Sequence, residues 1–511
     1  MLNYLKKINL TFIAVFLGLF FIELTAVQAQ EKLPADTSVV SSHQITIDGQ
    51  KIPYDVTVGT LPVYDDNGEP GAYVQYMYFK RTDIKDMSHR PILFSFNGGP
   101  GTASLWMNIG YTGPKRLNVS DEGWPVQPYG VEDNHHSILD VTDLVYINPV
   151  NTGFSRIIND GKKEDYFGVK VDVEYLSDWI ELFISRNERW TSPKFLMGES
   201  YGTTRVSEMA GVMQSNNNIF LNGVILQGNC GIGKTPDFGS PTASVLKLAS
   251  YTAAAWYHNK LPRDLQSRDL TEIFPEVEQF IFDTYLPAVA RSGSLTGAEK
   301  EEIAQQVGRY SGLSKQYILN HNLVVSSSSF WKELLRDEGM TIGRLDMRYK
   351  GIDEQNAGER SDYNAELLAW ENAFTPAMNK YLREDLGFKT DLKYYVFGPV
   401  HPWKRDAVNS GFGFSRFNVG DQLRQAMEAN PALQLLNQQG YYDGACDVLS
   451  AKYSLWHLDP TGKLQNRIHF TSYKSGHMLY VRKEDMIKGN EELRNFIQNV
   501  IPEDGEPIKH K

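Results

Sequence analysis

Short apolar runs that alternate with helical patterns are the feature that most constrains the fold of this chain. The runs lie at 92–96, 144–147, 194–197, 224–226, 433–436 and 467–470, and the last of them extends as far as 473. Such continuous runs are typical of strands that are buried on both faces. Helical patterns lie between several of them, at 171–184, 203–213 and 421–429. This alternation predicts an α/β fold with a mostly parallel central sheet flanked by helices.

Two other regions depart from this rhythm. Near the start, 44–47, 54–58 and 73–78 alternate apolar and polar residues around turn signals, which predicts antiparallel hairpins. From 235 to 403 the pattern is largely helical, and we interpret this stretch as a cap inserted over the sheet. The α/β core then has a first part at 30–234 and a second part at 404–511. A serine run at 326–329 is expected to be a loop.

The first 29 residues have the pattern of a signal peptide. Lys6 and Lys7 precede the apolar run 8–21, and small residues follow up to Ala29. An uncleaved membrane anchor is the alternative, but Glu23 and the small residues favour cleavage after Ala29. We therefore expect an exported protein, periplasmic or extracellular, with no stable membrane insertion after cleavage.

Charge and cysteine content exclude several classes of function. The net charge of −11 argues against a nucleic-acid partner, whose phosphates need a basic surface. The two cysteines, Cys230 and Cys446, are too few for a thiolate metal site, and the sequence leaves open whether they pair. No phosphate-binding loop of the Walker kind is present. We expect no metal and no cofactor, and the sequence carries no signal for an oligomeric state.

A candidate nucleophile lies in Gly198-Glu199-Ser200-Tyr201-Gly202, which fits the pattern G-x-S-x-G. The bare pattern is weak, but here a predicted strand precedes it and a predicted helix follows. A sharp strand-to-helix turn raises the serine hydroxyl above the sheet. We therefore interpret Ser200 as a catalytic nucleophile.

A serine nucleophile needs a base and a group that orients the base. Where such an elbow carries a triad, the chain order is serine, acid, histidine. His477 and Asp443 fit this order, and each follows a predicted strand. Asp447 is the alternative acid, one turn further from its strand. The glycine-rich Asn97-Gly98-Gly99-Pro100-Gly101, also after a strand, is a candidate source of backbone donors for an oxyanion.

Together these segments resemble the signature segments of the serine carboxypeptidases, and the resemblance is nearest to the bacterial branch of that family. The segments are 97–101, 198–202, 476–478 and a fourth at 143–155. The resemblance implies an α/β-hydrolase fold and peptide substrates.

The resemblance also implies a role for each site residue. Ser200 is the nucleophile, His477 the base and acid, and Asp443 the group that orients the histidine. The backbone N–H groups of Gly99 and Tyr201 form the oxyanion hole. The last two residues, Asn97 and Glu199, bind the terminal carboxylate of the peptide. Glu199 must be protonated to donate a hydrogen bond to a carboxylate, so we expect activity to be best in acid.

The chain departs from the family pattern at several positions. Tyr111 stands where eukaryotic members have a second carboxylate-binding glutamate, and Thr102 stands in place of a cysteine. Asn148 and Asn151 replace the more usual aspartate and glycine. Two alternatives therefore stay open: an esterase or acyltransferase with the same triad, and a catalytically silent binding protein. The presence of every triad candidate argues against the second.

Overall fold

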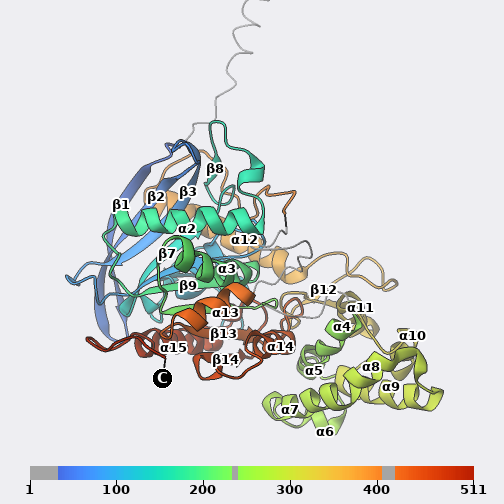
Figure 1. Cartoon of the computed structure of the whole chain (residues 1–511). Helices are drawn as coiled ribbons and strands as arrows, with labels where there is room; N and C mark the ends of the chain where they lie inside the picture. The colour runs from blue at the N-terminus through green and yellow to red at the C-terminus, as the bar shows by residue number, and fades with distance from the viewer. Residues whose placement is uncertain (1–32, 233–239, 405–419, 511) are drawn as a thin grey trace, which may run out of the picture.

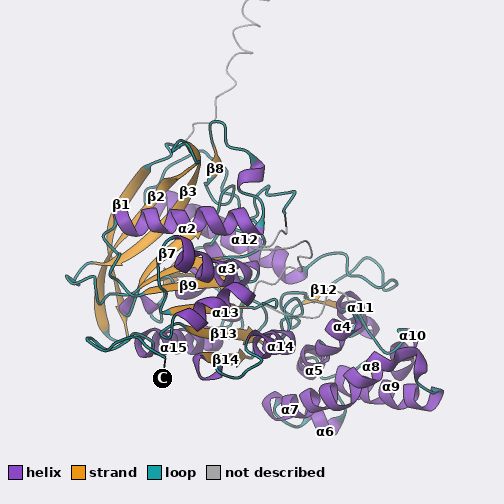
Figure 2. Ribbon diagram, in the orientation of Figure 1, coloured by secondary structure: helices purple, strands orange, loops and turns teal. Residues whose placement is uncertain are grey.

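The protein is described by a computed structural model that covers residues 33–232, 240–404 and 420–510. A ten-stranded sheet forms its centre, with the order β1-β2-β3-β7-β4-β9-β10-β13-β14 and with β8 beside β3 (Figures 1 and 2). The strands of this sheet are β1 (Thr37–Ile47), β2 (Gln50–Tyr64), β3 (Pro70–Arg81), β4 (Ile92–Phe96), β7 (Asp143–Asn148), β8 (Arg156–Ile157), β9 (Lys194–Glu199), β10 (Gly223–Gln227), β13 (Gln434–Gly440) and β14 (Ile468–Tyr473). Two short pairs lie outside it, β5 (Lys115–Leu117) with β6 (Val131–Asp133) and β11 (Thr341–Ile342) with β12 (Lys350–Gly351).

The sheet has an antiparallel part and a parallel part. Strands β1, β2, β3 and β7 pair antiparallel, and the tight turn at Asp48 and Gly49 joins the first two. From β7 onward through β4, β9, β10, β13 and β14 every pair is parallel. The alternation of strands and helices predicts this mostly parallel α/β sheet, and the architecture is the α/β-hydrolase fold that the family resemblance implies.

The central parallel strands β4, β7, β9 and β10 are buried along their whole length, and most of their residues are apolar because both faces of the sheet are covered. Along β4, Leu93 packs into one apolar cluster while Ile92 and Phe94 pack into the other, as the two-residue period of a strand requires. Each fully buried side chain of this size contributes roughly 1.5–3 kcal/mol. With four such residues among its five, β4 is therefore held firmly from both sides.

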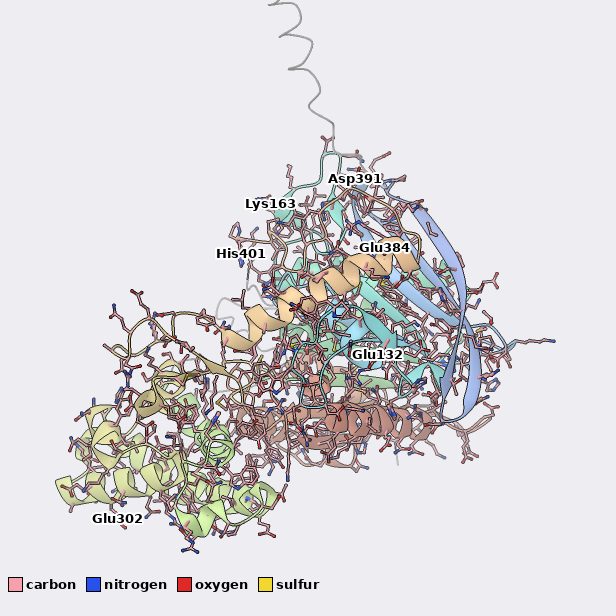
Figure 3. The ribbon with its side chains drawn as sticks, turned by 180° about the vertical axis from the view of Figure 1, so that it is seen from behind. Glu132, Lys163, Glu302, Glu384, Asp391 and His401 are labelled. Atoms are coloured by element: carbon pink, nitrogen blue, oxygen red, sulfur yellow. A yellow bond between two sulfur atoms is a disulfide. The ribbon has the colours of Figure 1, made fainter. Side chains whose placement is uncertain are left out.

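Different helices cover the two faces. One face carries α2 (Val169–Arg186), α3 (Tyr201–Asn216), α13 (Gly420–Ala429) and α14 (Val448–Leu458). The other carries α12 (Ala365–Lys380) and α15 (Lys483–Asn499). In the view from behind, α12 crosses the sheet and ends near Glu384 (Figure 3).

Between β10 and β13 the chain leaves the sheet and forms a separate helical lobe (Figure 1). Its helices are α4 (Pro241–Leu246), α5 (Leu248–Tyr257), α6 (Arg263–Gln266), α7 (Leu270–Phe280), α8 (Leu286–Arg291), α9 (Gly297–Ser311), α10 (Lys315–Asn320) and α11 (Ser327–Glu333). They bury an apolar cluster of their own, which also contacts Val448 and Leu449 of α14. Helix α12 and the segment after it pack instead against the core of the sheet.

The expectation of a loop at 326–329 is wrong. Ser326 is the N-cap of α11 and its side chain accepts a hydrogen bond from the backbone N–H of Ser329. Serine competes with the backbone for hydrogen bonds inside a helix but stabilises the first turn, so a serine run can begin a helix.

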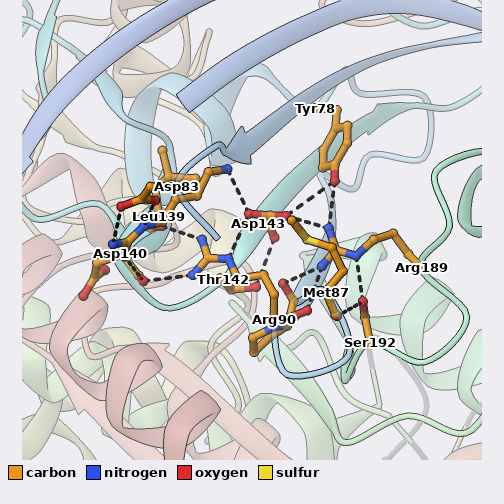
Figure 4. A network of polar contacts seen from close by, with 12 residues as sticks. Tyr78, Asp83, Met87, Arg90, Leu139, Asp140, Thr142, Asp143, Arg189 and Ser192 are labelled. Atoms are coloured by element: carbon orange, nitrogen blue, oxygen red, sulfur yellow. Dashed lines mark hydrogen bonds and ion pairs between the residues drawn. The ribbon is translucent and has the colours of Figure 1, made fainter. Parts of the chain in front are cut away.

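A buried ion network fixes the end of the sheet at which β7 begins (Figure 4). The carboxylate of Asp143 accepts hydrogen bonds from Arg90 at 3.0 Å and from Arg189 at 2.5 Å. Arg189 also donates to the carbonyl oxygens of Arg90 and Pro91. These bonds link β7 to the segment before β4 and to the loop before β9, so the three strands share one anchor.

The expected signal peptide, 1–29, lies outside the described residues. Across 33–232, 240–404 and 420–510, no helix combines the length and the apolar character that crossing a bilayer requires.

Candidate active site

Ser200 lies at the sharp turn between β9 and α3. Its backbone has φ 58° and ψ −124°, a conformation that side chains other than glycine rarely adopt. The turn is possible because Gly198 and Gly202 lie against each other: a Cβ at Gly198 would be 2.0 Å from the carbonyl oxygen of Gly202. The structure therefore has the strained strand-to-helix elbow predicted from the sequence.

Asp443 and His477 come together above the ends of β13 and β14. The Nδ1 atom of His477 lies 2.6 Å from Oδ2 of Asp443. The other oxygen of Asp443 accepts the backbone N–H groups of Ala445 and Cys446 at 2.9 and 2.8 Å. Burial alone would lower the pKa of His477, but the charge and the hydrogen bond of Asp443 outweigh burial and raise it.

The alternative acid, Asp447, has a different task. Its side chain accepts the backbone N–H of Ser450 at 2.8 Å and so caps α14. Asp443 rather than Asp447 is the carboxylate in contact with His477.

The hydroxyl of Ser200 makes no hydrogen bond to His477 in the described residues. It points toward Cys230, with Oγ 3.8 Å from Sγ, although Ser200 and His477 border the same pocket. Cys230 is disulfide-bonded to Cys446, which answers the question that the sequence left open. The bridge thus lies between the nucleophile and the turn that carries Asp443.

The loop 97–101 lies directly against the elbow. A Cβ at Gly98 would be 2.5 Å from the backbone nitrogen of Tyr201 and 2.8 Å from Cβ of Ser200, so only glycine fits there. Within the described ranges, the backbone N–H groups of Gly99 and Tyr201 have no hydrogen-bond acceptor. Unpaired donors beside a nucleophile match the requirement for an oxyanion hole.

Glu199 and Asn97 form a buried pair beside the same pocket. The Nδ2 group of Asn97 donates to Oε2 of Glu199, and the hydroxyl of Tyr480 donates to Oε1 at 2.7 Å. Burial raises the pKa of Glu199 to about 7, against the opposing influence of His477 and of the two donors. A protonated glutamic acid next to the nucleophile is therefore available near neutrality and below.

Tyr111 does not border the pocket. It is buried and stacks on Tyr480, with 5.1 Å between ring centroids, and its hydroxyl donates to Gln438 at 2.8 Å. Tyr111, which the family resemblance places at the position of a second carboxylate-binding glutamate, therefore contributes to the core.

Two residues that the sequence reasoning did not identify hold the site together. Arg205 on α3 forms a buried ion pair with Asp172 on α2 at 2.7 Å and donates to the carbonyl oxygen of Asn97 at 2.8 Å. The hydroxyl of Tyr201 donates to Asp172 at 3.1 Å. The sequence carried a signal for this pair, because each charged residue lies among apolar residues of a predicted helix. Arg and Asp are seldom fully buried unless they are paired, so an ion pair between the two helices could have been predicted.

The pocket above Ser200 has a volume of about 160 Å³. Its remaining walls come from three regions. Thr102 and Trp106 follow the glycine-rich loop, Met478 follows the histidine, and Arg344, Leu345, Leu367 and Phe397 belong to the segment between β10 and β13, the predicted insertion. The insertion therefore shapes the space in which a substrate would lie.

The described residues offer one group with metal-ligand atoms close together, Asp443, Cys446 and His477. The sulfur of Cys446 is bonded to Cys230, and the other two side chains are hydrogen-bonded to each other. These atoms are already engaged with one another.

Comparison with known proteins points to one family. The family described as serine carboxypeptidase matches residues 64–477. Two curated relatives from Arabidopsis thaliana are similar: serine carboxypeptidase-like 36, 29% identical over 194 residues, and serine carboxypeptidase-like 37, 27% identical over 205 residues. The aligned segments cover 37% and 38% of this chain and only 38% and 37% of these relatives.

One solved structure has a similar fold over most of its length. It is Kex1Δp, described as a prohormone-processing carboxypeptidase from Saccharomyces cerevisiae, with a TM-score of 0.50 and 15% identity. The similarity covers 89% of this chain and 93% of that one.

Proposed function

The chain belongs to the serine carboxypeptidase family, and from this premise we propose that it is an exported carboxypeptidase that releases C-terminal residues from peptides through an acyl-enzyme on Ser200. One observation carries the proposal. His477 is hydrogen-bonded to Asp443 and borders the same pocket as Ser200 and Glu199. The pKa of Glu199 is raised by burial to about 7. A perturbed acid beside a nucleophile and its base marks a site for acyl transfer with carboxylate recognition.

Acylation begins when Ser200 rotates its hydroxyl away from Cys230 and toward Nε2 of His477. The oxygen attacks the carbonyl carbon of the last peptide bond while His477 takes the proton. The N–H groups of Gly99 and Tyr201 stabilise the oxyanion that forms. The imidazolium, stabilised by Asp443, then gives its proton to the departing amine, and the C–N bond breaks.

Deacylation repeats the sequence with water. His477 removes a proton from a water molecule, whose oxygen attacks the acyl carbon, and the same N–H groups hold the second oxyanion. Return of the proton to Ser200 releases the shortened peptide. No step needs a cofactor, and the substrate is a peptide rather than a nucleic acid, in keeping with the net charge of −11.

Asn97 and Glu199 bind the terminal carboxylate in this proposal. The two side chains are hydrogen-bonded to each other, and Glu199 borders the pocket. Glu199 donates a hydrogen bond only while it is protonated, so peptide cleavage is favoured on the acid side of its pKa of about 7.

The proposal also includes export of the enzyme, a cap domain and membership of the bacterial branch of the family. Residues 1–29 act as a signal peptide, so the mature enzyme is periplasmic or extracellular, where a disulfide such as Cys230–Cys446 persists. The insertion 235–403 acts as the cap over the core parts 30–234 and 404–511. Tyr111 and Thr102, which differ from the eukaryotic pattern, favour the bacterial branch of the family.

The test combines labelling with product analysis. A fluorophosphonate probe should label the wild-type enzyme and fail to label Ser200→Ala; absence of wild-type labelling would refute both catalytic readings. Peptides digested with the enzyme should lose single C-terminal residues, as seen by mass spectrometry. The buried position of Tyr111 favours one alternative, an esterase or acyltransferase, because it leaves one carboxylate ligand fewer. Ready ester cleavage without a C-terminal ladder would establish that alternative.

A further inference from the structure

Arg344 is a cation that lies at the substrate pocket and has no acidic partner. Its side chain borders the pocket together with Ser200 and His477, and it is close enough that its charge lowers the pKa of His477, against the larger influence of Asp443. Across 33–232, 240–404 and 420–510, no acidic side chain forms an ion pair with its guanidinium. The side chain of Arg344 is exposed at the mouth of the pocket, so solvent rather than a carboxylate balances its charge.

The backbone of Arg344 is firmly held. It lies in the turn between β11 and β12, which pair antiparallel. The N–H groups of Arg344 and Leu345 donate to Oε1 of Glu366 at 3.0 and 2.6 Å. The carbonyl oxygen of Arg344 accepts the N–H of Gly444, directly after the triad acid, at 3.1 Å. The position of this cation is therefore tied to the catalytic turn.

The neighbouring acids are occupied elsewhere. Asp346 pairs with Arg348 at 2.6 Å, and both side chains are almost fully buried. Glu366 accepts the two backbone N–H groups through Oε1, while its Oε2 is buried and has no hydrogen-bond partner among the described residues. Glu199 accepts from Asn97 and Tyr480. Arg344 thus borders the pocket, its charge acts on His477, and no carboxylate in the described ranges is hydrogen-bonded to its guanidinium, whose donors are available to a bound molecule.

Apart from His477, whose proton takes part in catalysis, the pocket offers an anion only neutral donors. Asn97 and a protonated Glu199 can form hydrogen bonds to a carboxylate but cannot balance its charge, and Tyr111 is buried away from the pocket. Guanidinium groups match carboxylates in shape and charge and bind them through two parallel hydrogen bonds.

We propose that Arg344 binds a carboxylate of the substrate and so determines a preference for anionic peptides. This inference rests on the proposed function and adds a ligand to it. The carboxylate comes either from the C-terminus of the peptide or from an acidic side chain next to the scissile bond, and the substrates below separate these two sources.

The test compares wild type, Arg344→Met and the control Lys350→Met. Lys350 lies on β12 of the same hairpin, is exposed and does not border the pocket. The substrates are an N-blocked dipeptide with a free C-terminus, its C-terminal amide, matched dipeptides with Asp or Asn next to the scissile bond, and an N-blocked amino acid methyl ester without any carboxylate. We expect Arg344→Met to raise KM about tenfold or more for the carboxylate that is recognised.

Loss on the free acid but not on the amide identifies the C-terminal carboxylate. Loss on the Asp peptide but not on the Asn peptide identifies a side chain. The methyl ester should be cleaved equally by all three proteins. Unchanged KM values for every anionic substrate would overturn the proposal, and so would an equal loss on the ester, which would mean that Arg344 only supports the triad.

Failure of the proposed function would look different, because wild type itself would then release no C-terminal residue. In that event, inhibition of ester cleavage by an N-blocked amino acid, compared with its amide, still tests Arg344. The carboxylate form should inhibit wild type and Lys350→Met about tenfold more strongly than Arg344→Met. Equal inhibition of all three would overturn the inference.

Discussion

Replacing Glu199 by glutamine should change the pH dependence of the enzyme in a defined way. The pKa of Glu199 is raised to about 7 by burial. If the protonated acid is needed to bind a terminal carboxylate, kcat/KM for peptides is high below pH 7 and falls above it. At pH 8 roughly one tenth of the molecules keep the proton, so kcat/KM should drop about tenfold for each further pH unit.

Glutamine carries a hydrogen-bond donor at every pH. Its carbonyl oxygen can accept from Asn97, and the hydroxyl of Tyr480 can rotate to accept from its amide. The alkaline limb should therefore vanish in Glu199→Gln. The acid limb depends on neutral His477, and the negative charge of Glu199 helps to raise the pKa of that histidine. In wild type this charge is already absent below the pKa of Glu199, so the acid limb should stay at the same pH in Glu199→Gln.

The assay measures kcat/KM from about pH 5 to about pH 9 for an N-blocked dipeptide and for an N-blocked methyl ester. The ester has no carboxylate, so its alkaline limb should be absent in wild type as well. Glu302→Gln, on the exposed outer helix α9 (Figure 3), is the control for a loss of negative charge. A wild-type peptide rate that rises through pH 8, or an alkaline limb that survives in Glu199→Gln, would refute the reasoning.

Three further changes test the framework of the site. Gly98→Ala places a Cβ 2.5 Å from the nitrogen of Tyr201 and should lower kcat/KM about 100-fold. The control Gly130→Ala, whose Cβ has nothing within 4 Å, should leave kcat/KM unchanged, and equal kcat/KM values for the two variants would contradict the reasoning. Replacing both Cys230 and Cys446 by serine removes a disulfide between residues that are 216 positions apart in the sequence. The free energy of unfolding, measured by urea titration, should fall by about 5 kcal/mol, and an unchanged midpoint would contradict a stabilising role of the disulfide. Arg205→Met leaves the carboxylate of Asp172 buried without its cation. The free energy of unfolding in the same titrations should fall by about 3–5 kcal/mol, and a variant as stable as wild type would disprove that this ion pair stabilises the site.

The sheet could be predicted from the sequence because its central strands are apolar on both faces. The run 92–96 corresponds to β4 without error, and the run 194–197 corresponds to the start of β9. Strand β13 was predicted to end at 436 but continues to Gly440. Its last residues are polar and yet buried, since Asn437 accepts from Asn229 at 3.0 Å and Gln438 donates to Tyr473 at 2.7 Å. Hydrophobic periodicity cannot detect a strand whose buried side chains are paired amides.

The parts of the site that escaped prediction depend on contacts between distant segments. The acid itself was predicted as Asp443, but the sequence kept Asp447 as an alternative because both follow β13, and only the contact with His477 distinguishes them. The pairing of Cys230 with Cys446 and the burial of Tyr111 likewise depend on where remote segments meet. Local pattern carries no information about such distances.

The position of the Cys230–Cys446 bridge has a consequence for proteolytic damage. Nearly the whole helical lobe lies between the two cysteines in the sequence. A single cut in any loop of the lobe therefore produces two polypeptides that stay covalently joined next to Ser200. Such a nicked molecule would migrate as one band without reductant and as two bands with it.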